Sequence, residues 1–205
     1  MTTRGRLVAI EGIDGAGKST LQAQLAKALR KQRVRVRLWR EPSDPGLGRR
    51  AQRAGPTRPW TAALFFTLDR ARSRSRLDRL LSDCDVVLSD RSFYSTLAYQ
   101  GSAVGPAERR RMGDVQRAVA RRPDVVLWLR LPPEAALLRI RRRGARPAPL
   151  ERQRTLRRVA AAYARLARSN RWVTLDATRP VAELAVQAFA QLYQHRREPA
   201  PRQRR

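Results

Sequence analysis

The sequence predicts an α/β fold of three layers, in which a five-stranded parallel sheet lies between helices on both faces. Short segments rich in apolar and β-branched residues recur along the chain, and stretches with helical spacing separate them. This alternation is typical of parallel sheets in which a helix connects each strand to the next. The expected strands cover residues 7–10, 34–39, 85–89, 125–131 and 172–175.

The first expected strand leads directly into a glycine-rich phosphate-binding loop. Residues 12–19 read Gly-Ile-Asp-Gly-Ala-Gly-Lys-Ser, a complete G-x-x-x-x-G-K-S/T pattern. Backbone N–H groups of such a loop surround nucleotide phosphates, and the next helix directs the positive end of its dipole at them. The pattern therefore predicts a P-loop NTPase fold. The expected nucleotide-binding residues are Gly12, Ile13, Asp14, Gly15, Ala16, Gly17, Lys18, Ser19 and Thr20.

Two residues of this loop have specific expected roles. Lys18 should reach the β- and γ-phosphates of the nucleotide, and Ser19 should hold Mg²⁺. The helix after the loop is predicted by Leu21, Leu25 and Leu29, which recur every four residues and so share one face.

The third expected strand runs into the acid–base pair Asp90-Arg91. Both side chains should therefore lie at the carboxyl edge of the sheet, where open α/β folds bind their ligands. Asp90 is expected to hold Mg²⁺, directly or through water, and Arg91 is expected to bind an acceptor phosphate through its planar guanidinium. The alternative is an ordinary surface salt bridge.

A helical stretch at residues 64–70 places Phe66 and Arg70 on one face, because they are four residues apart. A ring beside a guanidinium is suited to stacking on a base and hydrogen-bonding to its edge. The alternative is that the ring belongs to the core.

The last two helices are predicted from their apolar spacing, and both stripes should face the core. One stripe consists of Leu156, Val159, Ala160, Tyr163, Leu166 and Ala167, and the other of Val181, Leu184, Ala185, Ala188 and Leu192. Before the last helix, the segment Asp176-Ala177-Thr178 follows the fifth strand and should also lie at the carboxyl edge.

An arginine-rich segment lies between the fourth strand and the penultimate helix. Glycine and proline within residues 139–149 should prevent a continuous helix, so a mobile lid is expected at about residues 139–152. Such a lid would exclude water and neutralise charge on a phosphoryl group in transfer. A solvated run of charge is the alternative. The arginines concerned are Arg141, Arg142, Arg143 and Arg146.

The composition predicts one domain over residues 1–195, followed by a disordered basic tail at 196–205. The 45 basic and 17 acidic residues give a formal net charge of +28, which attracts polyanions such as nucleic acid without requiring specific recognition. No apolar run is long enough for a membrane span or signal peptide, and the lone Cys84 cannot form an intrachain disulfide. A cytoplasmic protein is therefore expected.

Taken together and in this order, the segments resemble those of the thymidylate kinase family of P-loop nucleoside monophosphate kinases. The resemblance covers nearly the whole chain. It implies phosphorylation of dTMP to dTDP by ATP, with Mg²⁺ as cofactor, in a homodimer. The matching segments are residues 11–20, Arg40-Glu41-Pro42, Leu64-Phe65-Phe66 through Arg70, Asp90-Arg91 with Ser95, Tyr99-Gln100-Gly101, and Asp176-Ala177-Thr178 with Pro180.

The resemblance also implies individual roles. Asp14 would meet the 3′-hydroxyl of the acceptor sugar, Phe66 would stack on thymine, and Arg70 would bond the edge of that base. Because Gly15 stands where some members carry a catalytic arginine, the lid arginines would supply it. The implied substrate-binding residues are Asp14, Phe66, Arg70, Arg91, Ser95, Thr96 and Tyr99.

Two other functions remain open from the sequence. The segment Asp90-Arg91-Ser92 with Tyr94-Ser95 also resembles deoxynucleoside kinases, which phosphorylate a nucleoside 5′-hydroxyl, although Arg40-Glu41-Pro42 and Asp176-Ala177-Thr178 favour the monophosphate kinase. A non-catalytic P-loop protein that binds nucleic acid through its basic surface is the second.

Overall fold

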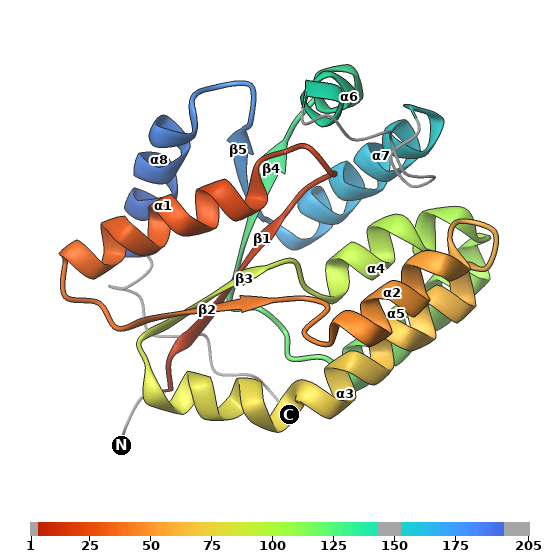
Figure 1. Cartoon of the computed structure of the whole chain (residues 1–205), viewed down its shortest axis with the longest axis horizontal. Helices are drawn as coiled ribbons and strands as arrows, with labels where there is room; N and C mark the ends of the chain where they lie inside the picture. The colour runs from red at the N-terminus through yellow and green to blue at the C-terminus, as the bar shows by residue number, and fades with distance from the viewer. Residues whose placement is uncertain (1–3, 143–152, 195–205) are drawn as a thin grey trace.

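The structure, a computed structural model, describes residues 4–142 and 153–194. In this part of the chain, parallel strands form one sheet in the order β2-β3-β1-β4-β5 (Figure 1). The strands are β1 (Arg6–Glu11), β2 (Val36–Arg40), β3 (Val86–Asp90), β4 (Val125–Arg130) and β5 (Val173–Asp176). The predicted α/β class and the five-stranded parallel sheet are confirmed, and the strand limits differ from the expected ones by one or two residues.

Helices cover both faces of this sheet. α1 and α8 pack together on one face, α3, α4 and α5 lie on the other, and α7 runs beside α4 (Figure 1). The helices are α1 (Lys18–Lys31), α2 (Pro45–Ala54), α3 (Pro59–Asp83), α4 (Phe93–Tyr99), α5 (Pro106–Val119), α6 (Pro133–Arg142), α7 (Gln153–Asn170) and α8 (Val181–Gln194), with a short 3₁₀ turn at Gly101–Ala103.

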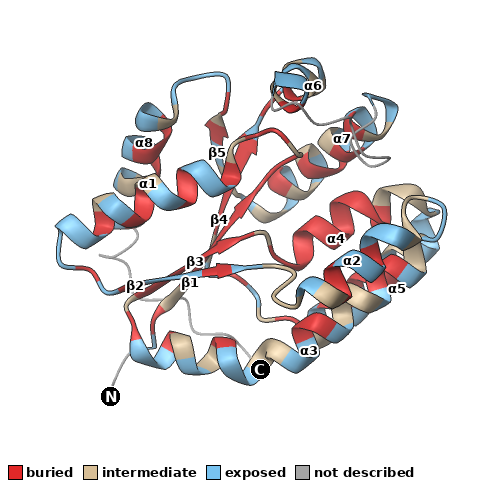
Figure 2. Ribbon diagram, in the orientation of Figure 1, coloured by how far each residue is buried: buried red, intermediate tan, exposed pale blue. Residues whose placement is uncertain are grey.

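The central strand β1 shows why both faces need helices. Its alternate residues point to opposite sides, so Val8 and Ile10 join the core under α1 and α8 while Ala9 joins the core under α3 to α5. All three are fully buried. Figure 2 shows β1 and β3 as largely buried strands and the edge strand β2 as partly exposed, with exposed residues on the outer sides of the helices. Strands buried on both faces read as continuous apolar runs, which is the pattern by which the sequence predicted them.

The two apolar stripes near the C-terminus face the core as expected. On α7, Leu156, Val159 and Tyr163 are fully buried, and on α8 Leu184 and Ala188 are buried.

The helix break expected from residue 139 onward is wrong in its position. α6 continues to Arg142, because Ala136 and Ile140 lie one turn apart and both pack into the core. Arg141 and Arg142 are therefore exposed helical residues. The glycine and prolines that motivated the break come later, and residues 143–152, with Arg143 and Arg146, lie outside the described residues.

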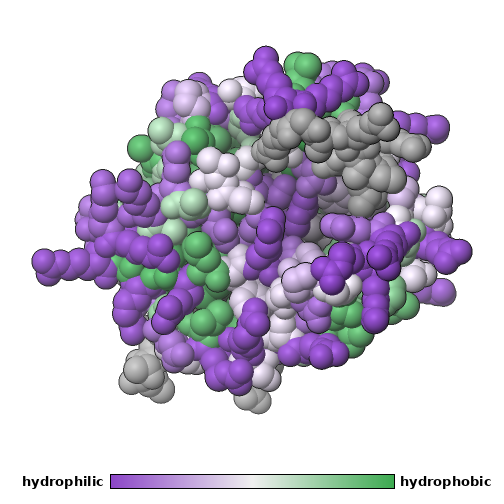
Figure 3. Space-filling view, in the orientation of Figure 1, coloured by the Kyte–Doolittle hydropathy of each residue, from purple (hydrophilic) through white to green (hydrophobic). Residues whose placement is uncertain are grey.

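The surface agrees with the composition. Hydrophilic side chains cover much of the face seen in Figure 3, with smaller apolar areas between them. Within residues 4–142 and 153–194, no helix is both long enough and apolar enough to cross a membrane.

Candidate active site

The phosphate loop connects the end of β1 to the start of α1. Gly15 has a φ of +83°, and a Cβ atom at this position would lie 2.8 Å from the carbonyl oxygen of Ala136 on α6. Only glycine combines this backbone conformation with such a close approach. α1 begins at Lys18, so its free N–H groups point into the loop. The sequence pattern thus forms the anion-binding geometry expected of it.

Lys18 is buried inside this loop. Its Nζ donates to the carbonyl oxygens of Gly12 at 3.1 Å and Ile13 at 3.0 Å, and it lies 3.8 Å from Oδ1 of Asp14. Burial and, to a smaller extent, the nearby positive charge of Arg91 lower the pKa of Lys18 from 10.5 to about 8, although the negative charge of Asp14 opposes the shift. The amine is therefore poorly solvated and close to losing its proton, and a bound anion would favour its charged form.

Ser19 and Asp90 lie side by side at the same edge. The hydroxyl of Ser19 donates to Oδ2 of Asp90 at 2.6 Å, and Arg40 Nε lies 3.8 Å from the same oxygen. Asp90 is the last residue of β3 and is buried, and its ion pair is with the exposed Arg40. Hydroxyl and carboxylate oxygens are ligands that Mg²⁺ prefers, so this pair fits the expected metal.

Arg91 follows β3 in an unusual backbone conformation, with a φ of +76°. Non-glycine residues seldom adopt such values, and they tend to do so at functional sites. Its guanidinium forms an ion pair with Asp14, donates to the Ser95 hydroxyl at 3.0 Å and lies over the Tyr99 ring. The Tyr99 hydroxyl donates to Oδ2 of Asp14 at 2.9 Å. The structure thus brings Asp14, Ser95 and Tyr99 into contact with the guanidinium of Arg91.

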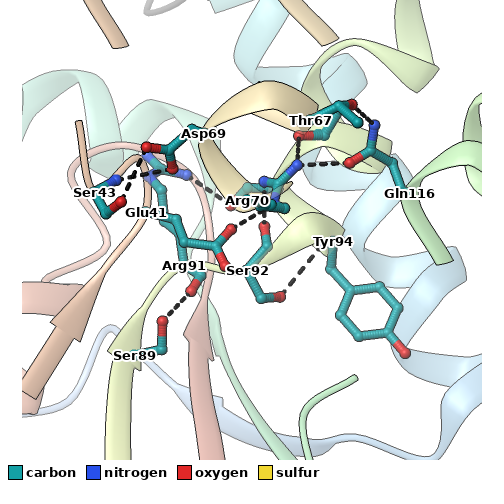
Figure 4. Close-up of polar contacts among 12 residues, drawn as sticks. Glu41, Ser43, Thr67, Asp69, Arg70, Ser89, Arg91, Ser92, Tyr94 and Gln116 are labelled. Carbon is teal, nitrogen blue, oxygen red and sulfur yellow. Dashed lines mark hydrogen bonds and ion pairs between the residues drawn. The ribbon is translucent and has the colours of Figure 1, made fainter. Parts of the chain in front are cut away.

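Arg70 of α3 lies buried about one turn of helix after the half-buried Phe66. Its Nε donates to Oε2 of Glu41 at 2.7 Å (Figure 4). Its Nη1 donates to the hydroxyl of Thr96 at 3.1 Å. Burial raises the pKa of Glu41, although the Arg70 charge opposes this shift. The base-pocket residues Arg70 and Thr96, expected from the resemblance, are therefore in direct contact.

The loop before α2 is held against α3 by Asp69. This buried carboxylate accepts hydrogen bonds from the backbone and hydroxyl of Ser43 and from the backbone of Asp44 (Figure 4). The anchor keeps Glu41 next to Arg70.

Sequence reasoning missed Glu11 as a site residue. This fully buried acid at the end of β1 accepts hydrogen bonds from the Ser92 backbone and hydroxyl, the Ser95 hydroxyl and the Tyr163 hydroxyl, at 2.7–2.8 Å. An acid at the end of an otherwise apolar strand was the one available signal. Tyr163 was predicted as core from its place in the α7 stripe, but nothing in that pattern indicated a polar partner.

A cavity of about 400 Å³ opens on the other side of the phosphate loop. Its lining includes Gly17, Thr20, Arg139 and Thr178, and Arg139 donates to the Ala177 carbonyl at 2.8 Å. The segment after β5 therefore lies beside the phosphate loop, at the carboxyl edge where it was expected. There is thus open space beside the loop, whereas Lys18 itself is buried, with Nζ 3.8 Å from Oδ1 of Asp14.

A phosphate loop, an oxygen pair suited to Mg²⁺ and a second cation, Arg91, directly after β3 are typical of a P-loop kinase that brings two phosphate groups together. A family model described as thymidylate kinase matches residues 10–188. The chain belongs to the thymidylate kinase family.

Individual relatives agree with the family match. The thymidylate kinase of Xanthomonas campestris pv. campestris (strain B100) is 36% identical over 93% of this chain and 84% of its own length. That of Xanthomonas euvesicatoria pv. vesicatoria (strain 85-10) is 39% identical over 79% of this chain and 72% of its own. A probable thymidylate kinase of Pyrobaculum calidifontis is 36% identical over 89% and 93%.

Proposed function

We propose that this site transfers the γ-phosphoryl group of ATP to the 5′-phosphate of dTMP, giving dTDP and ADP. Family membership supports this dTMP kinase activity. The observation that carries the proposal is the convergence of two cations on Asp14: Lys18 of the phosphate loop lies 3.8 Å away, and Arg91 of the β3 edge forms an ion pair with it. Two anionic substrates bound by these cations would meet at this point.

On the donor side, the loop and the start of α1 bind the triphosphate, with the nucleoside in the cavity beside Arg139. Ser19 and Asp90 would hold Mg²⁺, which when bound neutralises charge on the transferring phosphates. Lys18 regains full charge next to the β- and γ-phosphates, because their negative charge raises its lowered pKa.

On the acceptor side, Arg91 binds the 5′-phosphate of dTMP and Asp14 meets the 3′-hydroxyl of the sugar. Phe66 stacks on thymine, and Arg70 donates to its edge. The remaining pocket residues are Ser95, Thr96 and Tyr99, which already contact Arg91, Arg70 and Asp14, respectively.

The reaction needs no strong general base. The acceptor phosphate is largely dianionic near neutral pH, because its second pKa is about 6. Catalysis then depends on positioning and on neutralising charge around a loose transition state. We propose that Lys18, Arg91 and one of the lid arginines, Arg141, Arg142, Arg143 or Arg146, supply that positive charge.

A coupled assay of ADP release tests the proposal, with ATP as donor and dTMP, dUMP, other monophosphates or thymidine as acceptor. We expect turnover with dTMP, little with thymidine, and a loss of several orders of magnitude in Lys18→Ala. Preference for thymidine would favour a deoxynucleoside kinase. ADP release that no acceptor stimulates, together with salt-sensitive DNA retention, would favour the binding protein.

The arginines of the lid are tested one at a time. Single replacements of Arg141, Arg142, Arg143 and Arg146 by alanine should reveal one dominant effect on kcat. Four neutral results would contradict a catalytic role of the lid.

We also propose that the protein forms a homodimer, binds nucleic acid only non-specifically and works in the cytoplasm. Leu64 and Leu68, one turn apart on α3, are 57% and 45% exposed and offer an apolar contact for a second copy. The buried free thiol of Cys84 fits a reducing compartment. To test the homodimer, light scattering of Leu68→Glu should show a smaller mass than the wild type.

To test the non-specific binding of nucleic acid, deleting residues 196–205 should weaken polyanion retention without reducing kinase activity.

A further inference from the structure

α5 supports the part of α3 that carries the proposed base pocket. The Trp60 indole donates to Glu108 at 2.9 Å, near the starts of the two helices, and the Arg74 Nη1 donates to the Val119 carbonyl at 2.9 Å, near the end of α5. Between these two contacts lies Gln116, whose side chain is almost fully buried. None of the residues expected in the site from sequence belongs to α5, yet Gln116 contacts one of them directly.

That contact is with Arg70. Oε1 of Gln116 accepts a hydrogen bond from Nη1 of Arg70 at 2.6 Å, and Nε2 of Gln116 donates to the Thr67 hydroxyl at 2.7 Å (Figure 4). The Thr67 hydroxyl in turn donates to the Ala63 carbonyl at 2.8 Å, so towards Gln116 it acts as an acceptor. This order of donors fixes the amide: its NH₂ faces Thr67 and its oxygen faces Arg70.

The fixed amide oxygen completes the set of acceptors around Arg70. Nε donates to Glu41, Nη1 to Thr96 and Gln116, and Nη2 to the Ser92 carbonyl at 3.3 Å. A guanidinium carries five N–H donors. Within residues 4–142 and 153–194, four of them have an acceptor, and one N–H of Nη2 has none.

We propose that Gln116 is a positioning residue for acceptor recognition, which orients Arg70 so that a single Nη2 N–H is offered to the base. A guanidinium donates and never accepts, so an N–H that faces position 4 of the base favours the 4-carbonyl of thymine and disfavours the 4-amino group of cytosine. The inference rests on the proposed contact between Arg70 and the base, and it adds the residue that fixes that contact.

Gln116→Met tests this, because methionine has nearly the same size but leaves one Nη1 N–H without its acceptor. We expect the KM for dTMP to rise about tenfold, since a hydrogen bond to a charged group is lost, with kcat and the KM for ATP nearly unchanged. The ratio of kcat/KM for dTMP to that for dCMP should fall as well. Calorimetric titration with dTMP alone should show the same loss of affinity.

Thr67 supplies a second, milder variant. Thr67→Val removes the acceptor that orients the Gln116 amide, so the KM for dTMP should rise about threefold, whereas Thr67→Ser should retain the wild-type value. Because Thr67 is only half-buried, we expect both Thr67 variants to fold, so they test the positioning role of Gln116 even if Gln116→Met fails to fold.

Gln22→Met is the matched control. Gln22 is also a buried glutamine, but its Nε2 donates to the Trp39 carbonyl of β2 and the Leu88 carbonyl of β3, and it forms no hydrogen bond with Arg70. Gln22→Met should lower the melting temperature without changing the KM for dTMP. If the KM for dTMP rose in both Gln116→Met and Gln22→Met in proportion to the loss of melting temperature, the inference would be overturned.

Arg70→Met separates this inference from the proposed function. If Arg70→Met raises the KM for dTMP and Gln116→Met does not, the positioning role fails while the base contact stands. If Arg70→Met leaves the KM unchanged, both fail. The double variant Arg70→Met/Gln116→Met should resemble Arg70→Met alone, because Gln116 acts through Arg70, and a further additive loss would contradict the inference.

Discussion

Replacing Lys18 by methionine should change how the stability of the protein depends on pH. Burial lowers the pKa of Lys18 from 10.5 to about 8 in the folded protein, whereas the unfolded chain keeps the ordinary value. When the pH lies between these two pKa values, Lys18 carries a proton in the unfolded state that it has lost in the folded state. Stability therefore rises with pH in this window, and below it the buried charge costs free energy.

The size of this effect follows from the two pKa values. Integrated between about pH 7 and about pH 9.5, the difference in bound protons is worth about 2 kcal/mol of unfolding free energy. Urea denaturation of the wild type and Lys18→Met at several pH values measures this effect. Subtracting one plot of unfolding free energy against pH from the other cancels the contributions of the other titrating groups. The wild type should gain about 2 kcal/mol relative to Lys18→Met over this range. Parallel curves would refute the lowered pKa.

Nucleotide binding provides an independent measurement of the same group. Above about pH 8 a bound triphosphate must restore the proton of Lys18, so the affinity for ATP should fall by up to about tenfold per pH unit, with proton uptake on binding. Calorimetry in buffers of different ionisation enthalpy detects that uptake. Lys18→Arg is the control, because its guanidinium stays charged and its affinity should not change with pH in this range.

Three further predictions concern the rest of the site. Arg139→Ala removes a lining residue of the cavity that we propose for the nucleotide, so steady-state kinetics should show a KM for ATP about tenfold higher and an unchanged KM for dTMP. Gly15→Ala places a methyl carbon 2.8 Å from the Ala136 carbonyl oxygen, and urea denaturation should show a loss of about 2 kcal/mol. Glu41→Gln leaves the buried charge of Arg70 without its counterion and should cost about 3 kcal/mol in the same assay.

A different result would contradict each of these three predictions. An equal rise in both KM values for Arg139→Ala would indicate a general disturbance instead of a donor-site contact. Unchanged stability of Gly15→Ala would mean that α6 moves aside. For Glu41→Gln the matched variant is Glu134→Gln, whose ion pair with Arg157 is exposed, so stability should hardly change. Similar losses in both variants would show that burial of the Glu41 pair does not matter.

The phosphate loop and the strand-end pair Asp90-Arg91 were predictable because both are local. Eight consecutive residues specify the loop, and a buried strand that ends at a charged pair specifies the edge at which that pair lies. The lid was harder to predict. α6 extends to Arg142, three residues beyond the start of the expected break at residue 139, because Ile140 still packs into the core.

The buried hydrogen bonds of Glu11 and Arg70 depend on partners that are far apart in the sequence. Tyr163 donates to Glu11 across 152 positions, and Gln116 accepts from Arg70 across 46. Periodicity identified Tyr163 as buried, and no motif distinguished Gln116 from other polar residues of a helix.

The sequence by itself determined the order of strands and helices along the chain, the backbone of the phosphate loop and the edge of the sheet at which we propose that both substrates bind, because spacing and glycine positions specify local conformation and burial. The tertiary structure decided which polar side chains face one another across that edge. Contacts such as Glu11 with Tyr163 and Gln116 with Arg70 exist only after α3, α5 and α7 pack against the sheet, and the buried polar groups brought together by that packing must then satisfy one another.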